Sequence, residues 1–435
     1  MDPATEVAAV VVRAEEYEDR PVPESARRSL PSVAAVWVGF PMILTCAVFG
    51  GLVVHSLGFW AGMLAIALGN LVLMAYVGSL SYLAGRTGKT FALLAIETFG
   101  TRGYVIASGF LATIVIGWFA FQTGLTGSIL ASTMGWSEQW TTLLAGIGYV
   151  LVTLLGIRAL TAIGVIAAPL YLVLGGIAIA LALGTTTFGA ALDYAGGAGP
   201  GALSLGAAVT LVVACFIDSG TMTADFTRWS RNGRHGFWAA FAAFPVANTI
   251  ALVVGGVIVA LGAATDPARN GGNFLGALVE HGGVLVPVAV VFVFVNLGSV
   301  CTHCLYNGAV GWSQLTGNRM RPLAIVLGTI GVVLAVAGIW SHFEQWLNLL
   351  GVLVPPIGIA VILDQLVLPR FGYRSTPTPF RRPAFAAWAI GSSAALAAHL
   401  WAPWLSDAIV GMVVGAVAFV ALRTLAGDRA RLVAS

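Results

Sequence analysis

Long apolar segments recur along almost the whole chain and constrain its fold more than any other feature. We predict twelve of them, each close to the roughly 20 residues that a helix needs to cross a bilayer. Their limits are 33–53, 58–83, 104–132, 139–157, 161–184, 202–226, 236–263, 283–310, 322–340, 345–367, 384–402 and 404–423. Only 9% of the residues are charged, against about a quarter in soluble domains. The sequence therefore predicts an all-α integral membrane protein with twelve transmembrane helices.

Polar segments flank the apolar part of the chain. We expect 1–30 to be a cytoplasmic polar tail, 31–423 a single transmembrane domain and 424–435 a second cytoplasmic tail. If both termini are cytoplasmic, every Lys and Arg except Arg269 lies on the cytoplasmic side, as the excess of basic residues in inner loops requires. We therefore predict a multi-pass protein of the cell (plasma or inner) membrane.

Two of the predicted helices contain residues that interrupt a helix. They are Gly-Phe-Pro at 39–41 in the first and Asp-Ser-Gly at 218–220 in the sixth. Backbone groups left unpaired in hydrocarbon cost several kcal/mol each, so such breaks persist only beside a cavity or packed protein. Paired breaks, one in each half, are typical of transporters built from inverted repeats. We predict repeats of five helices at about 33–184 and about 202–367, followed by two helices at about 384–423; the alternative is two unrelated kinks.

Aromatic and amide side chains near these breaks are candidates for binding a planar ligand. Trp118 and Gln122 are four residues apart and share one face of the third helix. An indole can stack on a heteroaromatic ring, and an amide can donate and accept along its edge. Trp118 lies about fifteen residues from either end of its helix, too deep for the interfacial anchor that is its alternative role. Phe216, just before the second break, offers another aromatic face.

Polar residues on the sixth and eighth helices are the remaining candidates. Asp218, beside Ser219, is a carboxylate at membrane depth, where it must be paired or neutral. A structural role, satisfied by nearby N–H groups, is the alternative to reading the edge of a substrate and coupling transport to protons. Asn296, Ser299 and His303 form a polar stripe on the eighth helix, which predicts either a functional site or hydrogen bonds between helices.

Cysteines suggest no metal or disulfide framework. Cys301 and Cys304 form a Cys-Thr-His-Cys sequence within an apolar helix, and no second ligand pair accompanies them. We interpret them as packing residues and predict no metal site beyond a bound sodium ion.

Several motifs resemble the nucleobase–cation symporter family, in its purine and cytosine permease branch. They are "VPESARRSLPSVAAVWVGFPM", "GWF", "SGTMTADFTRWSRN", "LYNGAVGWSQLTG" and "VPPIGIAVILDQL". The resemblance implies a leucine-transporter-type fold with a five-plus-five inverted repeat. It also implies that a base stacks between Trp118 and Phe216. It further implies a sodium site whose ligands match Gly39, Met42, Asn296, Ser299 and Val300.

The chain departs from that family pattern at three positions. Val300 replaces a hydroxyl residue, which removes an oxygen ligand that sodium would use, and Asp218 and His303 replace smaller or neutral polar residues. We predict a secondary active importer of a cytosine-like base, coupled to sodium ions or protons. Alternatives are a carrier of a hydroxymethylpyrimidine, purine or hydantoin-type compound, a channel, or a membrane-embedded enzyme. Enzyme motifs are lacking, so we expect no catalysis and no organic cofactor. The expected partners are a small heterocycle and the bilayer, without nucleic acid or an obligatory protein.

Overall fold

The computed structural model describes residues 17, 20–197, 202–373 and 378–425. The predicted tails therefore lie largely outside the described residues. All twelve predicted spans fall on helices. Among the described residues, eight helices are long and apolar enough to cross a membrane, or nine if one bent pair counts as a single span. The remaining three spans are shorter or broken helices. The predicted all-α membrane architecture is confirmed.

The first five spans are continuous helices except for the first, which is broken. Their bounds are α2 (Leu30–Gly39) with α3 (Leu44–Leu57), α4 (Phe59–Thr87), α6 (Tyr104–Met134), α7 (Glu138–Leu154) and α8 (Ile157–Leu183). Glycines in the left-handed conformation end two of them, because Gly88 follows α4 at φ 72° and Gly135 follows α6 at φ 68°. Residues with a side chain rarely adopt this conformation.

The next five spans contain more interruptions. The sixth consists of α10 (Leu205–Ala214), α11 (Ile217–Thr221) and α12 (Ala224–Thr227), and the seventh of α13 (Gly233–Phe241), the π-helix η2 (Ala242–Asn248) and α14 (Thr249–Ala260). The eighth to tenth are α17 (Leu285–Thr316), α18 (Met320–Val336), and α19 (Phe343–Leu353) with α20 (Pro355–Ile362) and the π-helix η4 (Leu363–Val367). The last two spans are α21 (Arg382–Trp401) and α22 (Asp407–Leu425).

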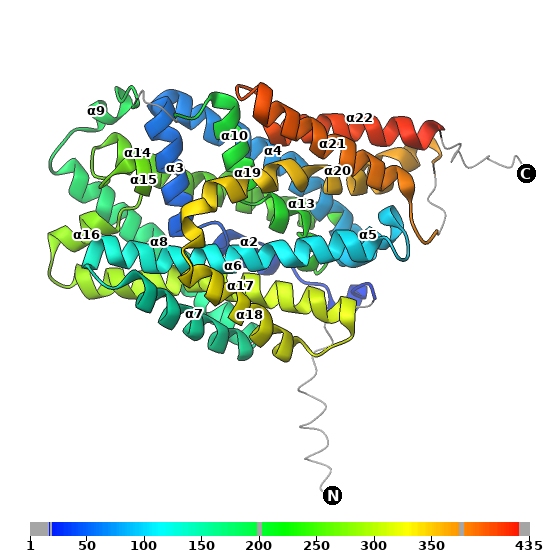
Figure 1. Cartoon of the computed structure of the whole chain (residues 1–435), viewed down its shortest axis with the longest axis horizontal. Helices are drawn as coiled ribbons and strands as arrows, with labels where there is room; N and C mark the ends of the chain where they lie inside the picture. Colours follow the sequence, from blue (N-terminus) through cyan, green and yellow to red (C-terminus); the bar gives the residue numbers. More distant parts are fainter. Residues whose placement is uncertain (1–16, 18–19, 198–201, 374–377, 426–435) are drawn as a thin grey trace, which may run out of the picture.

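Short helices occupy the connections. They are η1 (Glu24–Ala26), α5 (Phe91–Phe99), α9 (Phe188–Leu192), α15 (Pro267–Asn270), α16 (Leu275–His281), η3 (Ile339–His342) and η5 (Leu368–Phe371). In Figure 1, α5 lies at the right end of the molecule, and α9 and α16 lie at the left end. The long helices α6 and α17 run between these ends and pack against each other.

Loops predicted to share a side of the membrane are in contact. At one end, the Arg27 guanidinium donates to the carbonyl oxygen of Gly85 at 2.9 Å, and the N–H of Arg381 donates to the carbonyl of Phe99 at 2.9 Å. At the other end, the N–H of Phe59 donates to the carbonyl of Tyr194 at 2.9 Å. These contacts join loops that the distribution of basic residues predicts to lie together, and which end faces the cytoplasm stays a prediction.

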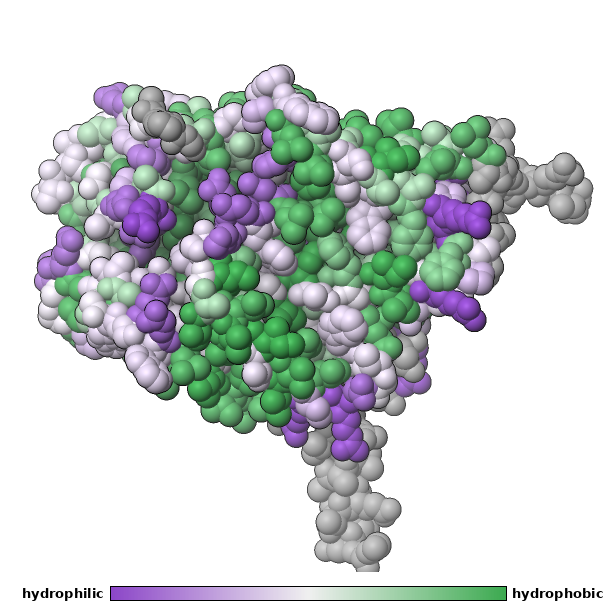
Figure 2. Space-filling view, viewed as in Figure 1, coloured by the Kyte–Doolittle hydropathy of each residue, from purple (hydrophilic) through white to green (hydrophobic). Residues whose placement is uncertain are grey.

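Apolar side chains cover the outward faces of the helices. Exposed apolar residues gather over α7 and α18 in Figure 2, and they include Leu144, Leu151, Val326 and Val333. Side chains of this kind are stable at the surface when the surrounding solvent is the hydrocarbon of a bilayer. The same helices turn small or polar residues inward, so the site must be sought in the interior.

The predicted break in the first span is confirmed, whereas the position predicted for the second break is wrong. The axes of α2 and α3 differ by 64° across residues 40–43. In the sixth span the helix breaks at Cys215 and Phe216, and Asp218 lies in the first turn of α11. Gly220 remains helical, and its N–H donates to the carbonyl of Phe216 at 2.7 Å. This glycine allows close packing, because a Cβ there would lie 2.6 Å from a methyl carbon of Val77.

Candidate substrate site

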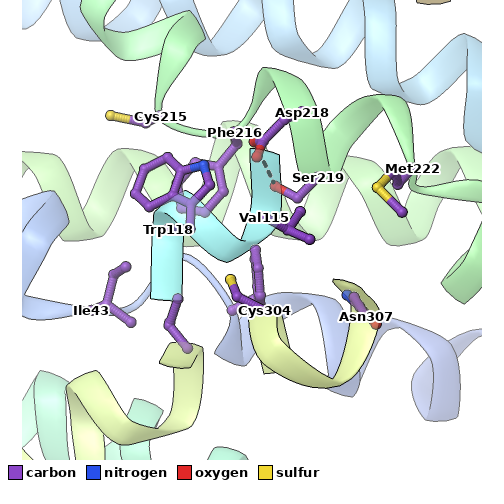
Figure 3. A pocket seen from close by; sticks show the side chains of 12 residues that line it. Ile43, Val115, Trp118, Cys215, Phe216, Asp218, Ser219, Met222, Cys304 and Asn307 are labelled. Carbon is purple, nitrogen blue, oxygen red and sulfur yellow. Dashed lines mark hydrogen bonds between the residues drawn. The ribbon is translucent and has the colours of Figure 1, made fainter. Parts of the chain in front are cut away.

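A cavity lies where the breaks of the first and sixth spans face α6 and α17. Its lining residues are Phe40, Ile43, Val115, Trp118, Cys215, Phe216, Asp218, Ser219, Met222, Val300, Cys304 and Asn307. They come from the break of the first span, α6, the sixth span and α17, and Figure 3 shows their side chains around the cavity. The volume open to a water-sized sphere is about 10 Å³, which is room for about one water molecule. The structure is thus a contracted form of the site, and a planar ring requires its walls to separate.

Three aromatic rings form the walls of this cavity. Trp118 comes from α6, and its ring lies edge-on to Phe343 with centroids 5.2 Å apart. Phe216, at the break of the sixth span, lies edge-on to Phe40 at 5.7 Å. Phe40 was missed as a binding residue by the sequence analysis, although its place beside Pro41 was a usable signal. An aromatic residue at a helix break has its side chain released from the helix surface and free to face the cavity.

Two polar atoms on the cavity wall make no hydrogen bond of good geometry among the described residues. They are the indole Nε1 of Trp118 and the carboxylate Oδ2 of Asp218, and both are buried. The other oxygen of Asp218 accepts a long bond, 3.5 Å, from the hydroxyl of Ser219. The backbone N–H groups of Asp218 and Ser219 and the indole N–H of Trp118 also lie close enough to stabilise the carboxylate. In Figure 3 the nitrogen-bearing edge of Trp118 is turned toward the carboxylate. Because buried polar atoms are normally hydrogen-bonded, the indole N–H and the carboxylate can bond to each other, or to a ligand that offers both an acceptor and a donor and separates them.

Gln122 and His303 lie near the cavity but do not line it. The amide oxygen of Gln122 accepts from the hydroxyl of Thr45 on α3 at 2.5 Å, while its nitrogen is buried without a partner among the described residues. Nδ1 of His303 lies 2.7 Å from the carbonyl oxygen of Ser299, and its ring is edge-on to Phe40. Direct contact of these two side chains with a substrate therefore stays a prediction.

Asn296 contacts the break of the first span instead of the cavity. Its amide nitrogen donates to the carbonyl of Met42 at 3.0 Å, and its amide oxygen accepts from the N–H of Leu44 at 2.7 Å. The side chain reaches from α17 and replaces backbone hydrogen bonds that the break removes from the first span. Its predicted contact with a substrate stays a prediction.

The residues predicted to bind sodium gather where the first, fifth and eighth spans meet. Gly164 of α8 lies between the other two spans. A Cβ on Gly39 would be 3.3 Å from the carbonyl oxygen of Gly164, and a Cβ on Gly164 would be 3.5 Å from the hydroxyl of Ser299. Val300 presents its apolar side chain to the cavity. Gly164 and Ser299 thus place oxygen atoms in this region, and the carbonyl of Met42 accepts from Asn296 with one of its two lone pairs.

The cysteines lie among packed helices. All four thiols are free and buried. Within the described residues, no group of three or more His, Cys, Asp or Glu side chains is arranged to hold a metal ion. Cys304 and Cys215 line the cavity, and Cys301 packs against Thr123 of α6.

Membrane transporters with known structures share this fold. Mhp1, a nucleobase-cation-symport-1 family transporter solved in a closed conformation with bromovinylhydantoin bound, superposes with a TM-score of 0.75 at 20% identity, over 95% of this chain and 96% of that one. Its inward-facing conformation gives a TM-score of 0.73 over 93% of each chain. A Na⁺-coupled sialic acid symporter gives 0.68 at 14% identity, over 95% of this chain and 92% of that one. These likenesses, together with the broken spans, show that the chain has a leucine-transporter-type fold.

Sequence similarity then identifies the family. Residues 21–427 match the family model described as permease for cytosine/purines, uracil, thiamine, allantoin. The cytosine permeases of Escherichia coli strain K12 and of Escherichia coli O157:H7 are each 30% identical to this chain over 351 residues, 81% of both chains. The chain belongs to this family of cytosine and purine permeases. It is a nucleobase–cation symporter by family and a membrane transporter, not an enzyme.

Asn296→Ala should destabilise the break in the first span. The substitution leaves the carbonyl of Met42 and the N–H of Leu44 without their partner, and a buried unsatisfied group costs about 1–3 kcal/mol. We expect faster hydrogen exchange at residues 42–46 and a lower unfolding temperature in detergent. Thr302→Ala, on the same helix, removes a hydroxyl that bonds only within α17 and serves as the control. Unchanged exchange at residues 42–46 in Asn296→Ala would contradict this role.

Proposed function

We propose that this permease imports a cytosine-like planar heterocycle, bound between the breaks of the first and sixth spans. The observation that carries the proposal is the cavity with aromatic walls in which a buried indole N–H and a buried carboxylate oxygen make no hydrogen bond of good geometry among the described residues. Two similar proteins bind or carry such rings: the cytosine permease of Escherichia coli and Mhp1 with its bromovinylhydantoin. A purine, a hydroxymethylpyrimidine or a hydantoin-type compound is the alternative substrate, because the same contacts suit their amide edges.

Stacking supplies the main apolar contact in this proposal. The rings of Trp118 and Phe216 lie on different segments of the cavity wall, so a flat ligand inserted between them would touch both. Phe40, edge-on to Phe216, would close the same wall. Because every nucleobase has a π-face, stacking alone gives affinity for bases in general. Discrimination among bases must then come from the polar edge.

Asp218 provides that polar edge. A charged carboxylate accepts from two adjacent N–H donors, whereas a protonated carboxyl group presents a donor beside an acceptor. The second pattern complements the edge of cytosine, in which the amino group is adjacent to an unprotonated ring nitrogen. The N–H of Trp118 is placed to donate to a further acceptor of the ring. Asp218 would therefore both recognise the base and carry the coupling proton, with His303 as a second candidate for proton transfer.

Coupling to protons is favoured over coupling to sodium by the cation region. In a sodium site formed by Gly39, Met42, Asn296 and Ser299, the carbonyl of Met42 would bind the ion with the lone pair that does not accept from Asn296, and the amide oxygen of Asn296 already accepts from Leu44. Val300 offers no oxygen, and a hard cation prefers several oxygen ligands. We propose that sodium stimulates transport weakly, although solved neighbours such as the sialic acid symporter are Na⁺-coupled.

We propose that the permease lies in the plasma or inner membrane of the cell. In the proposed orientation both termini are in the cytoplasm. The basic loops support it, since cytoplasmic loops carry an excess of Lys and Arg. Contacts of Arg27 and Arg381 lie at the end of the molecule that contains α5. We propose that this end faces the cytoplasm and that import runs toward it.

Trp118→Ala should weaken substrate binding roughly ten- to a hundredfold, because base–aromatic stacking contributes about 1–3 kcal/mol. The measurement is the binding of labelled cytosine and a panel of related bases to the purified protein. Trp60→Ala removes an indole exposed on the outer face of α4 and should bind normally. Normal affinity in Trp118→Ala would show that the assigned cavity is not the substrate site.

Asp218→Asn should abolish accumulation driven by a proton gradient while leaving the protein folded. The amide keeps a donor beside an acceptor but cannot exchange a proton, so binding should lose its dependence on pH. Selectivity should shift because bases with two adjacent N–H donors, which only the charged carboxylate can accept, should lose affinity. Uptake into proteoliposomes with an imposed pH gradient measures the first effect, and competition among bases measures the second. Wild-type accumulation together with wild-type selectivity would leave Asp218 with a structural role only.

Val300→Thr should strengthen the stimulation of uptake by sodium, because the hydroxyl restores an oxygen beside Ser299. Val293→Thr, buried on the same helix α17, is the matched control and should have no such effect. Initial uptake rates are compared with and without an inward sodium gradient at constant pH. Strong sodium stimulation of the unmodified protein without any response to pH would refute the proposed proton coupling.

A further inference from the structure

A second cavity lies between the fourth, fifth and eighth spans. Its volume is about 320 Å³, and its lining residues are Leu144, Ala145, Gly148, Tyr149, Val152, Ile163, Phe294, Val295, Gly298 and Thr302. These residues belong to α7, α8 and α17. It shares no lining residue with the substrate cavity. It is therefore a separate opening in the transmembrane part of the molecule, and its size is at the lower end of ligand pockets.

The polar groups in this cavity are already satisfied. The hydroxyl of Tyr149 is 3.1 Å from that of Thr126 on α6. The hydroxyl of Thr302 donates to the carbonyl of Gly298 at 2.8 Å. The other lining side chains are apolar or absent, so the cavity offers little to water or to a polar ligand. Its chemistry is that of a hydrocarbon-binding site.

The cavity opens toward the bilayer. Leu144 and Leu151, which flank it on α7, are 66% and 58% exposed, as expected of side chains that face lipid. At Gly148 between them, a Cβ would meet no atom within 4 Å. The glycine thus leaves a gap in an otherwise apolar outer face, and the surrounding solvent at this depth is the acyl chains of lipids.

We propose that this cavity binds an acyl chain of a membrane lipid. An apolar recess that opens into hydrocarbon is filled most readily by hydrocarbon, because a void forfeits dispersion contacts and water has no partners there. The bilayer supplies this occupant at high concentration and in the right orientation. A second copy of this chain is the competing occupant, and the experiment below distinguishes the two.

The bound chain would lie against the part of α17 that faces the candidate cation region. The hydroxyl of Thr302 also donates to the carbonyl of Ser299 at 3.0 Å. The ring of Tyr149 covers Gly298 so closely that a Cβ there would lie 2.6 Å from a ring carbon. An acyl chain between α7, α8 and α17 would therefore hold these helices apart. An effect of the lipid on transport rests on the proposed function, whereas binding of the lipid does not.

A photoactivatable phospholipid tests the binding directly. The full-length protein is reconstituted with a lipid that carries a diazirine in its acyl chain, and labelled peptides are mapped after illumination. We expect labelling of residues 294–302 on α17 in the wild-type protein, and its loss in Gly148→Leu, whose side chain fills the cavity. Gly176→Leu also adds a side chain where nothing lies within 4 Å, on the outer face of α8, and should retain the label.

Three results would overturn the proposal. They are no labelling of residues 294–302 in the wild-type protein, equal labelling in Gly148→Leu, and cross-linking of two copies of the chain through α7 and α17. The first result needs only the wild-type protein, so the proposal can be refuted even if a variant folds poorly. Uptake is measured separately: labelling that is lost without any change in transport would support lipid binding and leave the proposed substrate site untouched.

Discussion

The unsatisfied backbone at the two broken spans is the constraint on which the site depends. In hydrocarbon, each unpaired N–H or C=O group costs several kcal/mol, so a break must be compensated by another part of the protein. Asn296 does this for the first span by bonding both Met42 and Leu44. The sixth span limits its cost differently, since α11 resumes within two residues of the end of α10. The cavity forms where these two compensated breaks face each other. The contacts that stabilise the breaks therefore also determine where the site lies.

Much of the fold was predictable because its determinants are local. The length of an apolar segment decides whether it spans, and Pro41 removes a donor and clashes with the preceding turn wherever its helix packs. The break in the sixth span was placed wrongly because a glycine such as Gly220 has two possible structural roles. A glycine can end a helix, or it can allow a neighbouring helix to pack closely. The close contact with Val77, more than a hundred residues away in the sequence, shows that Gly220 has the second role.

The site was predictable where one helix determines a residue's surroundings. Trp118 is too deep in α6 for an interfacial role, and its side chain lines the cavity. Gln122 and Asn296 also point inward, but their partners, Thr45 and Met42, belong to the first span. A sequence periodicity shows that a side chain faces the interior without showing which helix meets it. Phe40 could not be assigned in this way. It lies beside a break, so helical periodicity does not predict the direction of its side chain.

The isolation of Asp218 explains how one residue can serve recognition and coupling in the proposed mechanism. The lining of the cavity contains no basic residue, so only neutral donors such as those of Trp118 and Ser219 stabilise a charge on this carboxyl group. A proton, or a ligand that supplies donors, would stabilise it further. A protonated carboxyl group matches the donor–acceptor edge of cytosine, whereas the charged form does not. Proton and base would then each raise the affinity for the other, since coupling between binding sites is reciprocal. Mutual stabilisation of this kind is what symport requires, because a proton gradient drives accumulation of the base only if the carrier moves neither ligand efficiently alone.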